Sequence, residues 1–142
     1  MITALERITG SFEKAVEEAG KILSVQGAVL PVTLKPTYLF AEMEDGKIIK
    51  GETNIDTFKP EVWTAVRRVW LEPGAELNPR VKKSILSADC VILSPGHFYT
   101  SLIPNLLVKG MKEVLKKTNA TVLYFVNLVT KYNETTGFKA SD

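Results

Sequence analysis

The hydrophobic pattern between residues 91 and 117 predicts a strand, a sharp loop and a helix. An apolar, β-branched run ends at Pro95-Gly96, and a polar turn follows it. Apolar or small residues then recur every three or four positions, as on one face of a helix: Ile103, Leu106, Leu107, Gly110, Met111, Val114 and Leu115. We therefore expect a helix from Ser101 to about Lys117.

The loop between this strand and this helix is a candidate anion site. In a parallel α/β sheet it lies at the carboxyl end of a strand and at a helix N-terminus, where free backbone N–H groups attract phosphate. No lysine or arginine lies between Ser94 and Asn105, so backbone groups would supply most of that attraction. A connection without a ligand is an equally good interpretation, because every doubly wound fold has several such loops.

The surrounding elements predict an α/β fold with a three-layer parallel sheet. We expect strands at residues 65–71, 90–93 and 121–129, and a helix from Pro79 to about Ala88. This β-α-β-α-β order favours adjacent parallel strands that helices cover. The carboxyl ends of all three strands would meet at one rim, where ligands of open sheets bind.

The first part of the chain predicts a helix and an added β-hairpin. Ser11 is an N-cap candidate for an amphipathic helix, and residues 28–33 read as a strand. Asp45-Gly46 is a strong hairpin signal between strands at residues 38–44 and 47–51.

Residues 55–64 are expected to form a loop, and Trp63 and Trp70 to be core or sheet-edge aromatics. The chain opens on ITALERITG, which reads as the end of a helix, and closes on Ala140-Ser141-Asp142, which reads as a helix N-cap. Both features lead us to expect an incomplete α/β domain.

Composition narrows the classes of function. The net charge of +2, with scattered basic residues, predicts no nucleic-acid partner. No apolar stretch approaches the roughly 20 residues that cross a bilayer, and no signal peptide is recognisable. The single cysteine, Cys90, lies in an apolar strand and is expected to be buried. We therefore expect a cytoplasmic protein.

Four polar residues of the 94–101 loop have chemistry to offer. His97 is the single histidine, and neither a cysteine nor a carboxylate stands near it in the sequence. We therefore expect no metal site and no catalytic triad around it. Tyr99 either contacts a ligand through its ring or hydroxyl, or packs at the sheet edge. Thr100 and Ser101 are expected to cap the helix, a geometry that phosphate binding shares.

Five strings together resemble the YvcK/CofD superfamily, and in particular the YvcK-type gluconeogenesis factors of bacteria. They occur in the same order along the whole chain: ITGSFEKAVEEAGKILSVQGAVLPVT (8–33), EDGKIIKGETNI (44–55), RVWLEP (68–73), ADCVILSPGHFYTSLIPNLLVKG (88–110) and VNLVTKYNETTGFKASD (126–142). The string YTSLIPNLLVKG is typical of the YvcK branch, whereas CofD-type 2-phospho-L-lactate transferases usually carry a loop closer to PSNPVTSI.

The resemblance implies a larger Rossmann-like domain with a GGGTG-type loop and a DDGGS-type segment. Neither string is present in this chain. Residues 1–142 are therefore expected to form a single α/β domain that corresponds to the central and later part of a larger one.

The resemblance also implies a regulatory protein that binds a UDP-sugar such as UDP-N-acetylglucosamine and supports gluconeogenic growth and cell-wall morphology. His97 stands where serine is usual, and Phe138 where a ligand-binding tyrosine is usual, so one hydroxyl contact would be lost. The candidate ligand-binding residues are Gly96, His97, Tyr99, Thr100, Ser101, Asn127, Thr130, Glu134 and Phe138.

No catalytic residue, metal or further cofactor is assigned, and we expect a binding protein more than an enzyme. The alternatives are a CofD-like 2-phospho-L-lactate transferase and a fragment without a ligand of its own. The expected partners are a nucleotide sugar and either a second copy of the chain or the remaining part of its own fold.

Overall fold

The computed structural model describes residues 1–62, 64–132 and 134–141. Trp63 and Asp142, which carried two of the expectations above, lie outside the described residues. The helices are α1 (Ile2–Thr9), α2 (Phe12–Ile22), α3 (Glu52–Asp56), α4 (Pro79–Ser87), the π-helix η1 (Phe98–Leu102), α5 (Ile103–Leu107) and α6 (Met111–Lys117). The strands are β1 (Tyr38–Met43), β2 (Ile48–Lys50), β3 (Val66–Glu72), β4 (Cys90–Leu93) and β5 (Thr121–Tyr124).

An antiparallel sheet of order β2-β1-β3 is formed by the middle of the chain. Gly46 adopts a φ of 85° in the turn between β1 and β2, and Asp45 Oδ1 accepts a hydrogen bond from Lys47 N–H at 2.9 Å. Both features are typical of a tight hairpin turn. The predicted hairpin is therefore confirmed.

The main hydrophobic core lies against one face of this sheet. Every second residue of β1 is buried, and Ala41 and Met43 are almost completely inaccessible. Ile55 of the short helix α3 packs on the same side with Ile49 of β2. This alternation is the pattern of a sheet with one covered face.

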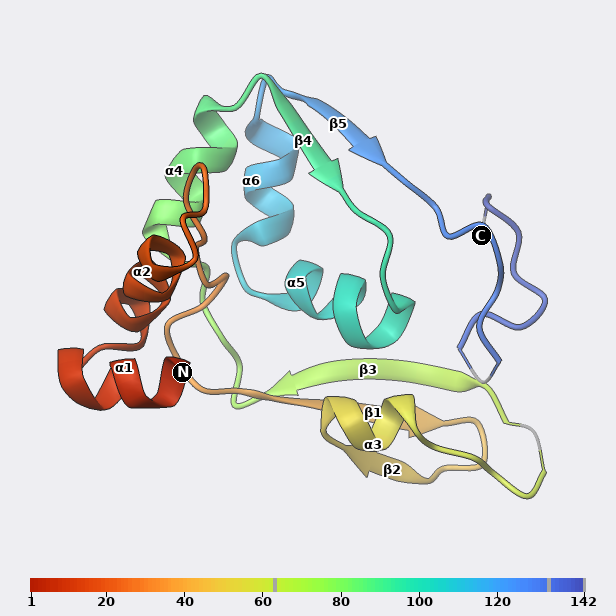
Figure 1. Ribbon diagram of the computed structural model, residues 1–142. Coiled ribbons are helices and arrows are strands. Elements are labelled where there is room, and N and C mark those ends of the chain that lie inside the picture. The colour runs from red at the N-terminus through yellow and green to blue at the C-terminus, as the bar shows by residue number, and fades with distance from the viewer. Residues whose placement is uncertain (63, 133, 142) are drawn as a thin grey trace.

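A separate parallel pair is formed by β4 and β5, with Cys90 opposite Thr121 and Leu93 opposite Tyr124. Figure 1 shows the two strands side by side, with α4 and α6 next to them and α5 between this pair and the antiparallel sheet. The fold is therefore a mixed α/β fold with both parallel and antiparallel strands.

The expected sheet of three parallel strands is wrong, because β3 pairs with β1 in antiparallel register, with Phe40 opposite Trp70. After β3 the chain turns away from the sheet and bonds to the segment before α6. Lys109 N–H donates to Ala75 O at 2.9 Å, and Leu77 N–H donates to Lys109 O at 3.0 Å. A hydrophobic strand pattern does not specify its partner, and the hairpin offers β3 a nearby free edge.

Two helix starts agree with the sequence. At the start of α2, Ser11 Oγ accepts a hydrogen bond from Lys14 N–H, and at the start of α4, Asn78 Oδ1 accepts one from Arg80 N–H. Pro79 follows Asn78 in the first turn, where its missing N–H costs nothing.

The expected strand at residues 28–33 does not form. Asn78 N–H donates to Val32 O, and Asn78 Nδ2 donates to Pro31 O, so this stretch is held against the start of α4. The expected strand at 121–129 ends at Tyr124, and α3 extends into the expected loop of residues 55–64.

The expected single helix from Ser101 to Lys117 is divided into η1, α5 and α6. The break lies at residues 108–110, where Gly110 has a φ of 97°. Glycine adopts this left-handed conformation at little cost. Val108, in the break, and Met111, just after it, are both buried.

The parallel pair has little cover, and every residue of β5 is exposed. Ile92 of β4 and three residues of β5 (Val122, Leu123 and Tyr124) are exposed, and so is Cys90. The expectation of a buried Cys90 is therefore wrong. Among the described residues no helix is both long and apolar enough to cross a membrane.

The position of the core leads to a stability prediction. We expect Met43→Ala to lower the free energy of unfolding by roughly 2–5 kcal/mol, because the side chain is fully buried in the core. The control Ile48→Ala, on the neighbouring strand and 58% exposed, should cost less than about 1 kcal/mol. Equilibrium denaturation measures both, and equal losses would contradict this assignment of the core.

Candidate functional site

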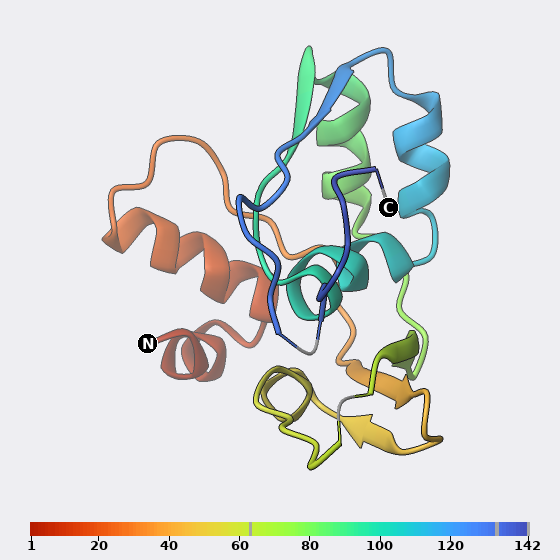
Figure 2. The ribbon, with the colours of Figure 1, turned by 90° about the vertical axis from the view of Figure 1, so that its right-hand side faces the viewer.

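The candidate site lies at the carboxyl ends of β4 and β5. The loop after β4 leads into η1, and the C-terminal tail after β5 folds back against that loop. Figure 2 shows the tail running past η1 toward α3. Asn127 Nδ2 donates a hydrogen bond to Gly96 O at 2.7 Å, which joins the tail to the loop.

Glu134 makes the second contact between the tail and the loop. Its side chain is only 4% exposed, and its Oε2 accepts a hydrogen bond from the backbone N–H of Phe98 at 3.0 Å. A turn holds the residue in place: Lys131 N–H donates to Thr135 Oγ1, and Thr135 N–H donates to Lys131 O, both at 2.9 Å. This turn presents Lys131 and Glu134 on the same side.

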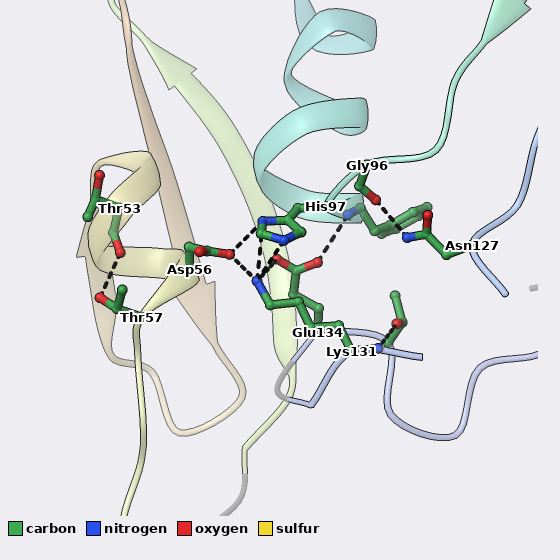
Figure 3. A network of polar contacts seen from close by, with 10 residues as sticks. Thr53, Asp56, Thr57, Gly96, His97, Asn127, Lys131 and Glu134 are labelled. Atoms are coloured by element: carbon green, nitrogen blue, oxygen red, sulfur yellow. Dashed lines mark hydrogen bonds and ion pairs between the residues drawn. The ribbon is translucent and has the colours of Figure 1, made fainter. Parts of the chain in front are cut away.

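Four ionisable side chains meet at this contact, and we call them the ionic cluster: Asp56 of α3, His97 of the loop, and Lys131 and Glu134 of the tail (Figure 3). His97 Nδ1 lies 2.7 Å from Asp56 Oδ1, and Lys131 Nζ lies 3.3 Å from His97 Nδ1. Lys131 Nζ also donates to Asp56 Oδ1 and lies 3.4 Å from Glu134 Oε1.

The cluster changes the acidity of two neighbouring groups. The hydrogen bond from Lys131, with the charges of Lys131 and His97, lowers the pKa of the Asp56 carboxyl below its ordinary value, although burial opposes this shift. Burial, and to a smaller extent the charge of Glu134, raises the pKa of the Tyr99 hydroxyl. Asp56 is therefore held ionised and Tyr99 neutral at physiological pH.

The expectation that His97 has no carboxylate near it is wrong. Asp56 and Glu134 are distant in the sequence, and the fold brings both to it. Asp56 and Lys131 were not predicted as site residues. The sequence carries no such signal for Asp56. For Lys131 the signal is its spacing of three residues from Glu134, which allows the two side chains to meet on one turn.

A pocket of about 280 Å³ lies beside the ionic cluster. Three of the residues predicted to bind a ligand, Asn127, Thr130 and Phe138, line it together with Phe98 and Lys139. The rings of Phe98 and Phe138 meet edge to face at a centroid distance of 6.1 Å. The pocket is mainly apolar with a few polar groups, as small-molecule sites usually are.

Gly96 and Ser101 belong to a different cavity. They line a space of about 390 Å³ between β4 and the apolar sides of α4 and α6. A Cβ atom on Gly96 would lie 3.2 Å from the Cβ of Ser101, and the φ of Gly96 is not positive. Glycine is thus favoured here by the close approach of Ser101 and not by backbone conformation.

The two hydroxyl residues after Tyr99 do not cap the helix as predicted. His97 is the N-cap residue of η1 and makes no side-chain capping hydrogen bond, whereas Glu134 of the tail accepts from the first amide of that helix. Thr100 is buried inside η1, and within the described part of the chain its Oγ1 has no hydrogen-bond partner. Tyr99 packs its ring edge against Phe98, at a centroid distance of 5.0 Å.

Several backbone amides of the predicted phosphate loop already have acceptors. Ser101 N–H and Leu102 N–H both donate to His97 O, and Phe98 N–H donates to Glu134. The carboxylate of Glu134 therefore occupies the position of an anion at this loop. A phosphate bound through the Phe98 amide would have to displace it.

The fold and the site together define an α/β protein with a ligand-sized pocket at the carboxyl ends of parallel strands. The chain belongs to the CofD family: the sequence model of that family, described as 2-phospho-L-lactate transferase CofD, matches residues 1–142. The resemblance inferred from the sequence is therefore confirmed.

The chain is also similar to individual proteins that carry a more specific name. The gluconeogenesis factors of Bacillus subtilis and Halalkalibacterium halodurans are 39% and 38% identical to the chain, over 100% of it in each case. The chain covers 44% and 43% of their lengths, so it spans less than half of these relatives. The crystal structure of a UPF0052-family protein from Bacillus halodurans is similar, with a TM-score of 0.89 and 37% identity over 99% of this chain and 45% of that one.

The ionic cluster leads to a pH prediction. The pKa of Asp56 is lower in the folded than in the unfolded chain, so its ion pairs stabilise the fold above the ordinary value of 3.8 and stop doing so as the pH falls through the folded-state pKa. We expect Asp56→Asn to lower the free energy of unfolding by on the order of 1 kcal/mol at pH 7, and the difference from wild type to shrink below about pH 4.

Denaturation of both proteins over a range of pH measures this difference. Asp89→Asn, which changes an exposed aspartate just before β4, is the matched control and should track the wild type. A constant difference down to the lowest pH would contradict the role of the ion pairs.

Proposed function

We propose that this chain binds a UDP-sugar such as UDP-N-acetylglucosamine and acts as a regulatory protein in gluconeogenic growth and cell-wall morphology. The observation that carries the proposal is the pocket between η1 and the C-terminal tail. Three residues expected to bind such a ligand (Asn127, Thr130 and Phe138) line it together. The similarity to gluconeogenesis factors supports the same class of function.

The aromatic wall of the pocket suits a nucleobase. Phe98 comes from η1 and Phe138 from the tail, and their rings meet edge to face in the pocket wall. A planar uracil gains stacking and dispersion energy against such rings. Asn127 uses an amide N–H to hold Gly96 O, and its side-chain carbonyl is an acceptor of the kind that a uracil N–H needs.

The positive charge that a diphosphate needs comes from a lysine of the tail and not from the loop. The sequence has no lysine or arginine between Ser94 and Asn105, but Lys139 lies in the pocket lining. A lysine ammonium at this place complements a phosphate group without displacing Glu134 from the Phe98 amide.

The size of the pocket limits what it holds. A volume of about 280 Å³ is at the small end for ligand sites and fits the nucleoside part of a nucleotide sugar better than the whole molecule. The sugar would then lie outside this pocket.

A CofD-like transfer of a phospholactyl group to a deazaflavin precursor is the second candidate. The description of the matching family model favours it. The loop YTSLIPNLLVKG favours the regulatory function. Formation of a phospholactylated deazaflavin from purified chain and substrates would decide for the transferase.

The aromatic wall leads to a binding prediction. We expect Phe138→Ala to weaken binding of UDP-N-acetylglucosamine by about tenfold, because one stacking face is lost. Tyr132→Ala is the matched control: it removes an exposed tail aromatic outside the pocket lining and should leave the affinity unchanged. Isothermal titration calorimetry measures both, and equal affinities for the two variants would contradict the assignment of the pocket.

A second substitution at the same position should act in the opposite direction. Phe138→Tyr restores the hydroxyl that similar proteins usually carry, and we expect it to tighten UDP-N-acetylglucosamine binding by several-fold through one added hydrogen bond. Titration of the Bacillus subtilis gluconeogenesis factor under the same conditions is the reference. Binding by that relative together with none by this chain would contradict the proposed function.

A further inference from the structure

We propose that Asp56, His97 and Glu134 form a binding site for a divalent transition-metal ion such as Zn²⁺, and that Lys131 is a built-in cation that the metal displaces. The sequence alone predicts no metal site here, because the two carboxylates come from distant segments. The proposal concerns the ionic cluster and is independent of nucleotide-sugar binding in the neighbouring pocket.

The three donor groups are close enough to share one ion. One ligand atom from each residue lies within 4.8 Å of the other two (Figure 3). Donor atoms around tetrahedral Zn²⁺ are roughly 3.4 Å apart, given Zn–N and Zn–O distances of about 2.1 Å. A movement of about 1 Å, within the reach of side-chain rotation, would complete the site.

The donors are also held in place by the fold. Glu134 is 4% exposed at its side chain, and its Oε2 is oriented by the Phe98 amide, which leaves Oε1 facing the cluster. Asp56 ends α3, directly after Ile55 of the core. Outer hydrogen bonds and rigid supports of this kind orient metal ligands and raise their affinity.

A positive charge already sits among these donors. The ammonium of Lys131 contacts Asp56, His97 and Glu134. Replacing a monovalent ammonium by a divalent ion neutralises the two carboxylates, and Lys131, with a side chain 31% exposed, has solvent to move into.

The donor set selects the kind of metal. One imidazole nitrogen and two carboxylate oxygens suit Zn²⁺, Co²⁺ and Ni²⁺. Ca²⁺ and Mg²⁺ prefer oxygen ligands alone and more of them. A water molecule or a ligand atom would complete the coordination.

Opposite effects of two substitutions test the site. We expect the chain to bind one Zn²⁺ by calorimetry, and one Co²⁺ with a visible absorption band. Lys131→Gln should raise the affinity for both ions by about tenfold, because the competing cation is removed. His97→Ser should lower it by at least about tenfold, because a ligand is lost. A gain in affinity cannot result from unfolding.

Two control variants test whether Zn²⁺ binds elsewhere on the chain. Lys112→Gln removes an exposed cation from α6 and should leave the Zn²⁺ affinity unchanged. Cys90→Ser removes the exposed thiol and should also leave it unchanged. Loss of Zn²⁺ binding in Cys90→Ser, or an affinity of Lys131→Gln no higher than that of wild type, would overturn the proposal and leave Lys131 as a permanent counter-ion.

Discussion

The structure of the site depends on one buried carboxylate. A charged group out of water is costly unless partners compensate for the lost hydration. Glu134, with a side chain only 4% exposed, has two: the Phe98 amide on one oxygen and the Lys131 ammonium on the other. The Phe98 amide reaches Glu134 only when the tail lies against the start of η1, whereas Lys131 belongs to the tail itself. The burial of Glu134 therefore depends on the contact between the tail and η1.

The ionic cluster also links the two sheets. Asp56 belongs to the unit formed by the antiparallel sheet and α3, whereas His97 and Glu134 follow the strands of the parallel pair. Ion pairs through Lys131 and His97 connect the two units at the pocket. Because Phe138 comes four residues after Glu134 along the tail, the same contacts hold the part of the tail that supplies the aromatic wall of the pocket.

Elements with a strong local signal could be predicted from the sequence. Asp45-Gly46 determines its hairpin turn, and Ser11 and Asn78 determine their helix starts, through interactions within three residues. The partner of β3 and the break at Gly110 could not be predicted, since they depend on contacts made by the whole fold. The same holds for the site: the sequence pointed to Asn127, Glu134 and Phe138 of the tail, but Asp56 joins them only through long-range packing.

The parallel pair of strands is more exposed than parallel strands usually are. Parallel strands are normally buried on both faces, because helices lie on either side of them. Here Ile92, Leu123 and Tyr124 are exposed, and Leu128 and Val129 of the following segment are exposed as well. Tyr124 and Leu128 also line the pocket. Because side chains alternate along a strand, Leu123 and Tyr124 lie on opposite faces of β5, so the pocket adjoins only one of the two uncovered faces of the pair.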